Sequence, residues 1–170
     1  MRLAFFSDSH GDVTALRSAM EAAMLHGRVD AFAFLGDGIH DFLDLQSFIK
    51  KHNPLAVTHA VRGNNDPAML DLKEELVVSF AGFWIFLTHG HRQRVKLTDR
   101  LLLEDARDRQ CRIALFGHTH RAFLEEKDGV LLMNPGSVAI PAGKGPTAGM
   151  IEIGSDGRII PQILNLKAYL

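Results

Sequence analysis

Residues Leu3–Asp12 read Leu-Ala-Phe-Phe-Ser-Asp-Ser-His-Gly-Asp, a run that begins apolar and ends in side chains that bind metals. Its apolar, β-prone start is typical of a buried strand. Asp8 and His10 follow at the end of this strand, and open α/β sheets bind ligands beyond the carboxyl ends of their strands. A polar turn before a helix is the simpler explanation of this motif taken alone. The interpretation therefore depends on whether other strands end in the same way.

The composition indicates one globular domain over residues 1–170, with 46% hydrophobic and 23% charged residues. A net charge of −1 gives no electrostatic basis for binding nucleic acid or an acidic membrane. The single cysteine fits a reducing compartment, and we expect a cytoplasmic protein with neither a signal peptide nor a membrane span. The unusual feature is the presence of nine histidines, because histidine is a common metal ligand.

The first third of the chain alternates between strands and helices. We expect a helix over Asp12–His26, capped by Asp12 and ended by Gly27. An apolar strand, Asp30–Leu35, then runs into Gly36-Asp37-Gly38. A second helix over Asp41–Lys51 and a third strand over Leu55–Val61 follow. This alternation predicts parallel strands joined by helices.

The rest of the chain is richer in strands. We expect a hairpin of Glu75–Phe80 and Phe83–Thr88, a helix over Thr98–Arg109 capped by Thr98, and a turn at Asn134–Ser137. The other expected strands are Ile113–Phe116, Ala122–Glu126, Val130–Met133, Met150–Ile153 and Ile159–Leu164. Parallel units followed by a meander predict an α/β protein with two mixed sheets facing one another and helices outside.

Five of the expected strands end in polar side chains suited to binding metals. These candidate ligands are Asp8, His10, Asp37, Asn64, His89, His118 and His120. Seven ligands are too many for one tetrahedral ion, but they suit two ions that share a carboxylate. The set contains no thiolate, and mixed imidazole and carboxylate ligation suits manganese, iron, nickel or zinc.

The order of these motifs resembles that of the calcineurin-like metallophosphoesterases, and most closely the small phosphodiesterases of the YfcE type. The resemblance runs from Arg2 to about Ile153. It rests on Asp-x-His, Gly-Asp, Gly-Asn-x-Asp, His-Gly-His and Gly-His-x-His in the same order, together with Asn134-Pro135-Gly136-Ser137. The fold that it implies is a four-layer α/β/β/α sandwich.

The resemblance also implies a role for each candidate ligand. Asp8, His10 and His120 would hold one divalent metal ion, and Asn64, His89 and His118 would hold the other. Asp37 would bridge the two ions. Manganese is the first choice, with nickel, iron or zinc as alternatives.

The implied reaction is hydrolysis of a small phosphodiester by in-line attack of a metal-bridging hydroxide. One alternative is a phosphomonoesterase that uses the same site. Another is a non-catalytic scaffold similar to the retromer subunit with this fold. The resemblance leaves a homo-oligomer open.

Three further residues near these motifs receive expected roles. Many larger relatives have a histidine at position 65, where this chain has Asn65, so we expect Asn65 to contact phosphate without supplying a proton. His91 is either a substrate contact, a support for a ligand or a solvated loop residue. Asp66 is expected to orient a ligand histidine. The basic residues Arg92, Arg94 and Lys96 are expected to form a solvated face, with a phosphate clamp as the alternative.

Overall fold

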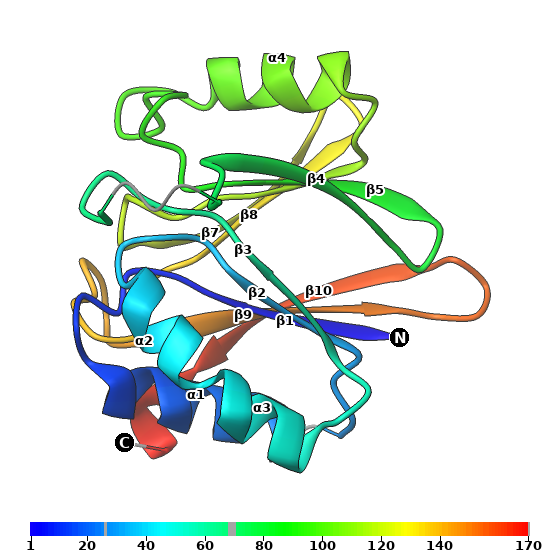
Figure 1. The fold of residues 1–170 in the computed structure, drawn as a ribbon. Coiled ribbons are helices and arrows are strands. Elements are labelled where there is room, and N and C mark those ends of the chain that lie inside the picture. Colours follow the sequence, from blue (N-terminus) through cyan, green and yellow to red (C-terminus); the bar gives the residue numbers. More distant parts are fainter. Residues whose placement is uncertain (26, 68–70, 170) are drawn as a thin grey trace.

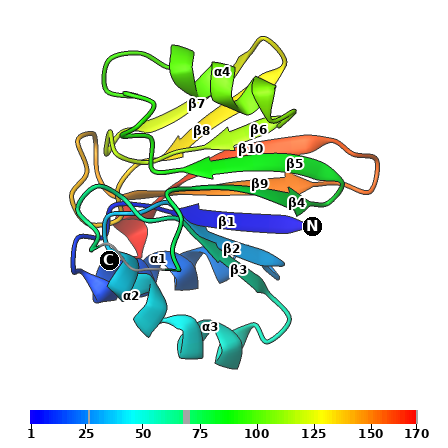
Figure 2. The ribbon, with the colours of Figure 1, turned by 45° about the horizontal axis from the view of Figure 1, so that its top comes forward.

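The computed structural model describes residues 1–25, 27–67 and 71–169, and these form two five-stranded sheets packed face to face (Figure 1). Helices α1, α2 and α3 cover the outer face of one sheet, and α4 covers the outer face of the other (Figures 1 and 2). This arrangement confirms the predicted four-layer sandwich of two mixed sheets between helices. It also brings the ends of strands from both sheets to one end of the molecule (Figure 2).

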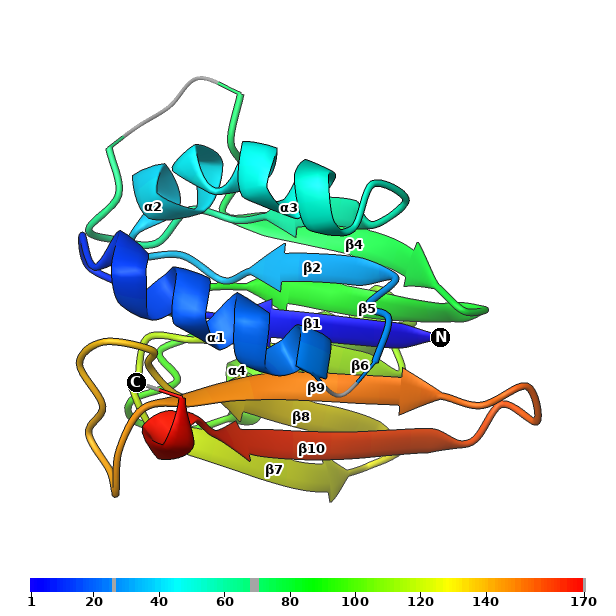
Figure 3. The same cartoon turned by 90° about the horizontal axis from the view of Figure 1, so that it is seen from below.

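The first sheet has the order β10-β9-β1-β2-β3. Strands β1, β2 and β3 are parallel to one another. Strand β9 is antiparallel to both of its neighbours, β1 and β10. Figure 3 shows α1 lying across this sheet. The bounds are β1 (Arg2–Phe6), β2 (Ala31–Phe34), β3 (Val57–Ala60), β9 (Thr147–Ile153) and β10 (Ile159–Asn165), with α1 (Val13–Leu25), α2 (Ile39–Asp44), α3 (Gln46–His52) and the 3-10 helix η1 (Leu166–Ala168).

The second sheet has the order β4-β5-β6-β8-β7. Strands β5, β6 and β8 are parallel, and the two edge strands β4 and β7 are antiparallel to their neighbours. The bounds are β4 (Glu75–Phe80), β5 (Phe83–Thr88), β6 (Ile113–Leu115), β7 (Ala122–Lys127) and β8 (Val130–Pro135), with α4 (Arg100–Asp108) outside. The predicted hairpin of β4 and β5 is confirmed to the residue.

Apolar side chains fill the space between the two sheets. Leu3 and Phe5 of β1 contact a cluster that includes Ile85 and Leu87 of β5 and Leu115 of β6. The residues that alternate with them on β1, Ala4 and Phe6, point to the opposite face and pack under α1. Both faces of β1 are therefore covered, which is why its sequence is continuously apolar rather than alternating.

The predicted helix over Asp41–Lys51 is wrong in detail, because α2 and α3 are separate helices that meet at Leu45. Leu45 has a backbone ψ of 0°, and its buried side chain belongs to the cluster under α1. The hydrogen bond from Leu45 N to Asp41 O persists at 3.3 Å, so the interruption is local. Hydrophobic periodicity does not distinguish such a bend from a continuous helix.

The N-terminal cap of α1 is confirmed, and Thr98 makes the capping hydrogen bond predicted for α4. Asp12 accepts a 2.8 Å hydrogen bond from Ala15 N. In α4, Thr98 Oγ1 accepts a 3.3 Å hydrogen bond from Arg100 N. Asp99, which follows Thr98, already has helical backbone angles, and its side chain makes no capping bond. Its carboxylate instead binds Lys127. The expected last residue of the first helix, His26, lies outside the described residues.

The predicted turn at Asn134–Ser137 begins later than expected, because Asn134 and Pro135 belong to β8. They pair with Phe123 and Ala122 of the edge strand β7. The pairing of β8 with β6 ends at Met133, so the missing N–H of Pro135 interrupts no hydrogen bond there. Within the described ranges, no helix has the length and apolar character needed to cross a membrane.

We predict that Gly149→Ala destabilises the fold by about 1–3 kcal/mol, the usual effect of overpacking a core. Gly149 lies opposite Phe5 in the pairing of β1 and β9, and an added Cβ would lie only 2.1 Å from the Phe5 ring. Urea unfolding measures the difference. Gly143→Ala is the control, because an added Cβ there meets nothing within 4 Å. Equal stability of the two variants would contradict this description of the core.

Candidate metal centre

Six of the seven candidate ligands form two groups at the carboxyl ends of the strands. The groups are Asp8, His10 and His120, and Asp37, His89 and His118. In each group the ligand atoms all lie within 4.8 Å of one another. Each group contains one buried carboxylate and two imidazoles. The sequence motifs, which are up to 112 residues apart, therefore converge as predicted.

In the first group, the ring nitrogens surround one oxygen of Asp8. His120 Nε2 lies 3.1 Å and His10 Nε2 lies 3.8 Å from Asp8 Oδ1. The two Nε2 atoms are 3.3 Å apart. Asp8 Oδ1 is buried and accepts no hydrogen bond in the described structure. Because buried carboxylate oxygens are normally satisfied, this oxygen needs a cation or a proton donor.

In the second group, His89 Nε2 lies 3.3 Å from Asp37 Oδ2 and 3.2 Å from His118 Nδ1. Asp37 Oδ2 is also 3.9 Å from His10 Nε2 of the first group. One carboxylate oxygen is thus within reach of ligand atoms from both groups. This is the arrangement expected of a carboxylate between two ions.

Main-chain carbonyls orient two of the histidines. His89 Nδ1 lies 2.7 Å from Leu35 O, and His120 Nδ1 lies 2.7 Å from Ile140 O. A carbonyl oxygen only accepts, so each Nδ1 carries a hydrogen, and in the neutral imidazole each Nε2 offers its lone pair to the centre. The donor set and its tautomers therefore fit divalent cations.

The backbone of the centre is strained in an unusual way. Five candidate ligands have φ between +48° and +68°, a region that non-glycine residues seldom adopt; they are Asp8, His10, Asp37, His118 and His120. Close approach adds a second constraint. A Cβ at Gly63 would lie 2.1 Å from Asp37 Oδ1, and one at Gly117 would lie 3.1 Å from Asp8 Oδ2. The loops thus fit together only with glycine at these two positions.

Burial and neighbouring charges set the protonation of the centre. Burial favours the neutral carboxyl of Asp37, but the hydrogen bond and charge of His89 hold its pKa well below the usual range. Burial acts against the charged form of His89 too, yet the carboxylates of Asp37 and Asp8 raise its pKa. Burial and the charge of His89 lower the pKa of His118 to about 4. The nearby carboxylate of Asp8, 3.1 Å from His120 Nε2, raises the pKa of His120.

The two neighbouring asparagines lie at the edge of the centre and differ in their contacts. The Asn65 side chain donates to Asp37 Oδ2 at 2.6 Å, and its backbone N donates to Asp37 Oδ1 at 2.8 Å. The Asn64 side chain is exposed and makes none of the hydrogen bonds found among the described residues. In the structure Asn65 therefore binds the Asp37 carboxylate, whereas the Asn64 side chain makes no such bond.

The expected role of Asp66 is wrong. Its carboxylate accepts four backbone N–H groups at 2.7–2.9 Å, from Asp37, Gly38, Ile39 and Gly63. No histidine in the described ranges donates to it. Asp66 thus fixes the loop that carries Asp37 and satisfies amides at the start of α2, instead of orienting a ligand histidine.

His91 lies beside the second group. Its ring centroid is 5.6 Å from that of His89 and 6.2 Å from that of His118. Burial and the charge of His89 lower its pKa, and its Nδ1 is buried without a hydrogen bond in the described structure. Its Nε2 is 4.0 Å from Glu74, which also pairs with Arg62.

Sequence reasoning missed the residues that support the ligand loops from below. Ser137 Oγ donates to Asp8 O at 2.7 Å and accepts a hydrogen bond from Ile140 N. The carbonyl of Ile140 in turn orients His120. Asn134 Nδ2 donates to Gly117 O at 2.6 Å, in the loop that carries His118 and His120. The only sequence signal was the motif Asn134–Ser137, which was interpreted as a turn.

A family model for the calcineurin-like phosphoesterase superfamily domain matches residues 1–156. Probable metallophosphoesterase YsnB of Bacillus subtilis is 32% identical over 141 residues, 83% of this chain and 77% of that protein. Phosphodiesterase YfcE of Escherichia coli K12 is 27% identical over 174 residues, 89% of this chain and 88% of that protein. The chain therefore belongs to the calcineurin-like phosphoesterase superfamily and is a metal-dependent phosphoric ester hydrolase.

Solved structures agree with this assignment. A predicted phosphoesterase from Streptococcus pneumoniae TIGR4 has a TM-score of 0.76 at 26% identity and covers 97% of this chain and 89% of its own. Vps29 from Entamoeba histolytica, solved with zinc, has a TM-score of 0.69 at 23% identity and covers 98% and 100%. The likeness to Vps29 is one of fold alone.

We predict that Asp66→Ala lowers the free energy of unfolding by about 3 kcal/mol, because several buried N–H groups lose a charged acceptor. Loss of metal affinity should accompany the loss of stability, since the Asp37 loop is no longer fixed. Urea unfolding and metal titration measure both effects. Asp44→Ala, at an exposed position in α2, is the control. An Asp66 variant that binds metal normally would contradict the supporting role.

In metal-free protein, we predict that His118 titrates near the pKa of about 4 given by its surroundings. A normal histidine titrates near ~6.5, so His118 should stay neutral between those two pH values and keep its Nδ1 lone pair available. His89 and His120 should remain protonated to higher pH, because their pKa values are raised. Imidazole NMR titration measures this order. A His118 that titrates above His120 would contradict it.

Proposed function

We propose that this protein is a dinuclear phosphodiesterase in which Asp37 bridges two divalent metal ions. The observation that carries the proposal is the position of Asp37 Oδ2, which is 3.3 Å from His89 Nε2 and 3.9 Å from His10 Nε2. A carboxylate with ligand groups on both sides suits two ions that share it. A single structural zinc ion would not need a second set of ligands.

In this proposal Asp8, His10 and His120 hold one ion, and His89 and His118 hold the other. Asn64 completes the second set after a rotation of its exposed side chain. Two ions bound there would lower the pKa of a water molecule for in-line attack on phosphorus and offset the charge that develops on the phosphoryl oxygens. Manganese is the first choice, because imidazole and carboxylate ligands without thiolate suit it; nickel, iron and zinc are alternatives.

The chain's own residues then position the shared carboxylate and the substrate. Asn65 donates two hydrogen bonds to Asp37, which hold both of its oxygens in place. Burial lowers the pKa of His91 and keeps the imidazole neutral near pH 7. It is therefore suited to donate a hydrogen bond to a phosphoryl or leaving oxygen, but not to transfer a proton to it. Neither residue is a strong acid, and good leaving groups should be favoured.

A small phosphodiester is the proposed substrate, in keeping with the activity named for YfcE. The test is turnover by metal-stripped protein with single divalent metals added back. Bis(p-nitrophenyl) phosphate should be hydrolysed, and p-nitrophenyl phosphate only slowly. A preference for the monoester would favour the phosphomonoesterase, and no turnover of either ester with any metal would favour the non-catalytic scaffold.

We predict that Asp37→Asn lowers both metal content and turnover, because one substitution weakens the ligands of both ions. Metal stoichiometry should fall from two ions per chain to fewer than one. The value of kcat/KM should fall about a thousandfold, which corresponds to a loss of about 4 kcal/mol of transition-state stabilisation. Elemental analysis and the diester assay measure these effects. Asp44→Asn is the control for the surface charge. Retention of two ions by Asp37→Asn would contradict the bridging role.

The adjacent asparagines provide a matched pair of variants. Asn64→Ala should lose one of the two ions, because it removes a ligand. Asn65→Ala should retain both ions and lower kcat, because it releases the Asp37 carboxylate and removes a donor near the phosphate. Metal analysis and steady-state kinetics compare the two variants. The opposite pattern, with metal lost only in Asn65→Ala, would show that the two roles are reversed.

A further inference from the structure

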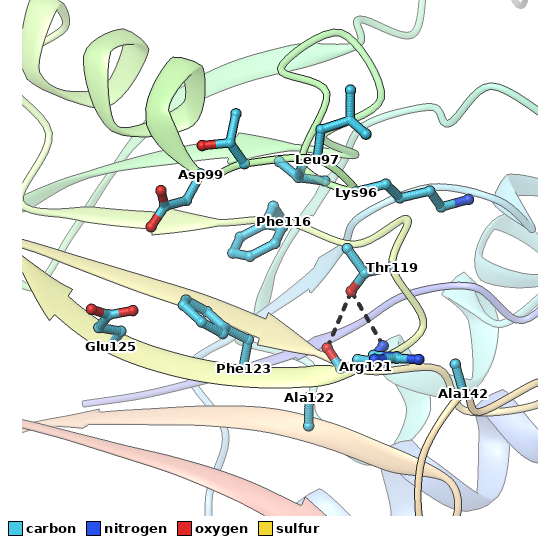
Figure 4. Close-up of a pocket in the computed structure, with 12 residues that line it drawn as sticks. Lys96, Leu97, Asp99, Phe116, Thr119, Arg121, Ala122, Phe123, Glu125 and Ala142 are labelled. Atoms are coloured by element: carbon cyan, nitrogen blue, oxygen red, sulfur yellow. Dashed lines mark hydrogen bonds between the residues drawn. The ribbon is translucent and has the colours of Figure 1, made fainter.

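A cavity of about 680 Å³ opens directly beside the candidate metal centre. Thr119, which lies between the candidate ligands His118 and His120, lines it together with Arg121 (Figure 4). Its other wall is the segment Val95–Asp99 that precedes α4. A volume of about 300–1,000 Å³ is typical of small-molecule sites. The cavity is therefore larger than a phosphate group needs.

Two aromatic side chains that pack edge to face against each other line this cavity. Figure 4 shows the rings of Phe116 and Phe123 between Asp99 and Glu125 at one end and Arg121 at the other. Their centroids are 6.0 Å apart and their planes are inclined by 61°. Val95 and Leu97 add aliphatic surface, and Leu97 is 82% exposed. An aromatic ring seated here would gain edge and face contacts as well as burial.

The cationic side chains of the cavity lie toward the metal centre. Lys96 and Arg121 make no ion pair with any residue in the described ranges. Both lie on the same side of the cavity as Thr119, the residue between His118 and His120 in the sequence (Figure 4). At the other end of the cavity, Asp99 is neutralised by Lys127 at 3.0 Å. The cavity thus offers positive charge beside the centre and apolar surface beyond it.

A second hollow of about 530 Å³ shares Arg121, Ala122 and Ala142 with the first. It is lined by His120, Gly143, Lys144, Gly145, Thr147 and Asn165, and none of its lining residues is a phenylalanine, tyrosine or tryptophan. A polar group suits it better than an aryl ring. The comparison favours the first cavity for an apolar arm.

We propose that the cavity lined by Phe116 and Phe123 binds an aromatic ester arm of the substrate, while Lys96 and Arg121 attract its phosphodiester monoanion toward the centre. The proposal rests on the proposed phosphodiesterase function and narrows the substrate class to diesters with an aryl or nucleoside arm. It assigns Phe123 and Leu97 to specificity. It also replaces the expectation that Lys96 belongs to a merely solvated face.

Diphenyl phosphate and dimethyl phosphate are the probes, because they share the phosphodiester anion and differ in their arms. Amide NMR is recorded on protein loaded with Zn²⁺, which is diamagnetic. Diphenyl phosphate should shift the amides of residues 95–99 and 122–125, and dimethyl phosphate should not. Phe123→Ala should weaken diphenyl phosphate binding by about tenfold, as expected for lost apolar burial, and leave dimethyl phosphate binding unchanged.

Leu124→Ala is the matched control, because Leu124 follows Phe123 on β7 and points to the opposite face of the sheet. Leu97→Ala is a second test at an exposed position, where folding is not at stake, and should weaken diphenyl phosphate binding as well. The proposal is overturned if both probes shift the same amides, or if Phe123→Ala and Leu97→Ala bind diphenyl phosphate as tightly as the wild type.

Turnover of bis(p-nitrophenyl) phosphate by the same preparations separates this proposal from the proposed function. Turnover without shifts in the cavity contradicts the arm site and leaves the phosphodiesterase intact. Cavity shifts with diphenyl phosphate but no turnover with any metal support the arm site and contradict the reaction.

Discussion

The carboxylate of Asp37 is the point at which the two sheets depend on each other. It follows β2 of the first sheet, and its Oδ2 lies 3.3 Å from His89, which follows β5 of the second. The Leu35 carbonyl, two residues before Asp37, in turn accepts from His89 Nδ1. Any shift of one sheet against the other would therefore separate ligands of the centre. The apolar layer between the sheets has a functional consequence, because it fixes the spacing of these groups.

Local strain at the centre is balanced by hydrogen bonds from neighbouring segments. Asp8 and Asp37 adopt left-handed backbone angles, each an unfavourable conformation for a residue with a side chain. Ser137 holds the carbonyl of Asp8, and Asp66 holds the amide of Asp37. These supports are themselves buried or partly buried. These supports hold the carboxylates and imidazoles of the centre close together before any cation binds.

The sequence predicted the strands and the candidate ligands better than it predicted their supports. Strand ends are visible because apolar runs stop abruptly at Asp8, Asp37 or His118. The bend at Leu45 is invisible to periodicity, since its side chain remains apolar and buried. Asp66 was misassigned because a carboxylate that accepts backbone N–H groups looks the same in sequence as one that orients a histidine. The cavity lined by Phe116 and Phe123 could not be predicted from the sequence, because its walls come from segments that only the fold brings together.

The central claim is that two ions share Asp37, and anomalous diffraction from crystals soaked in Mn²⁺ tests it most directly. Two manganese peaks are expected, roughly 3.5–4 Å apart as in other two-metal sites. One peak should lie against Asp8, His10 and His120, the other against Asn64, His89 and His118, with Asp37 between them. A single peak at full occupancy, or a second peak that does not contact Asp37, would contradict the account.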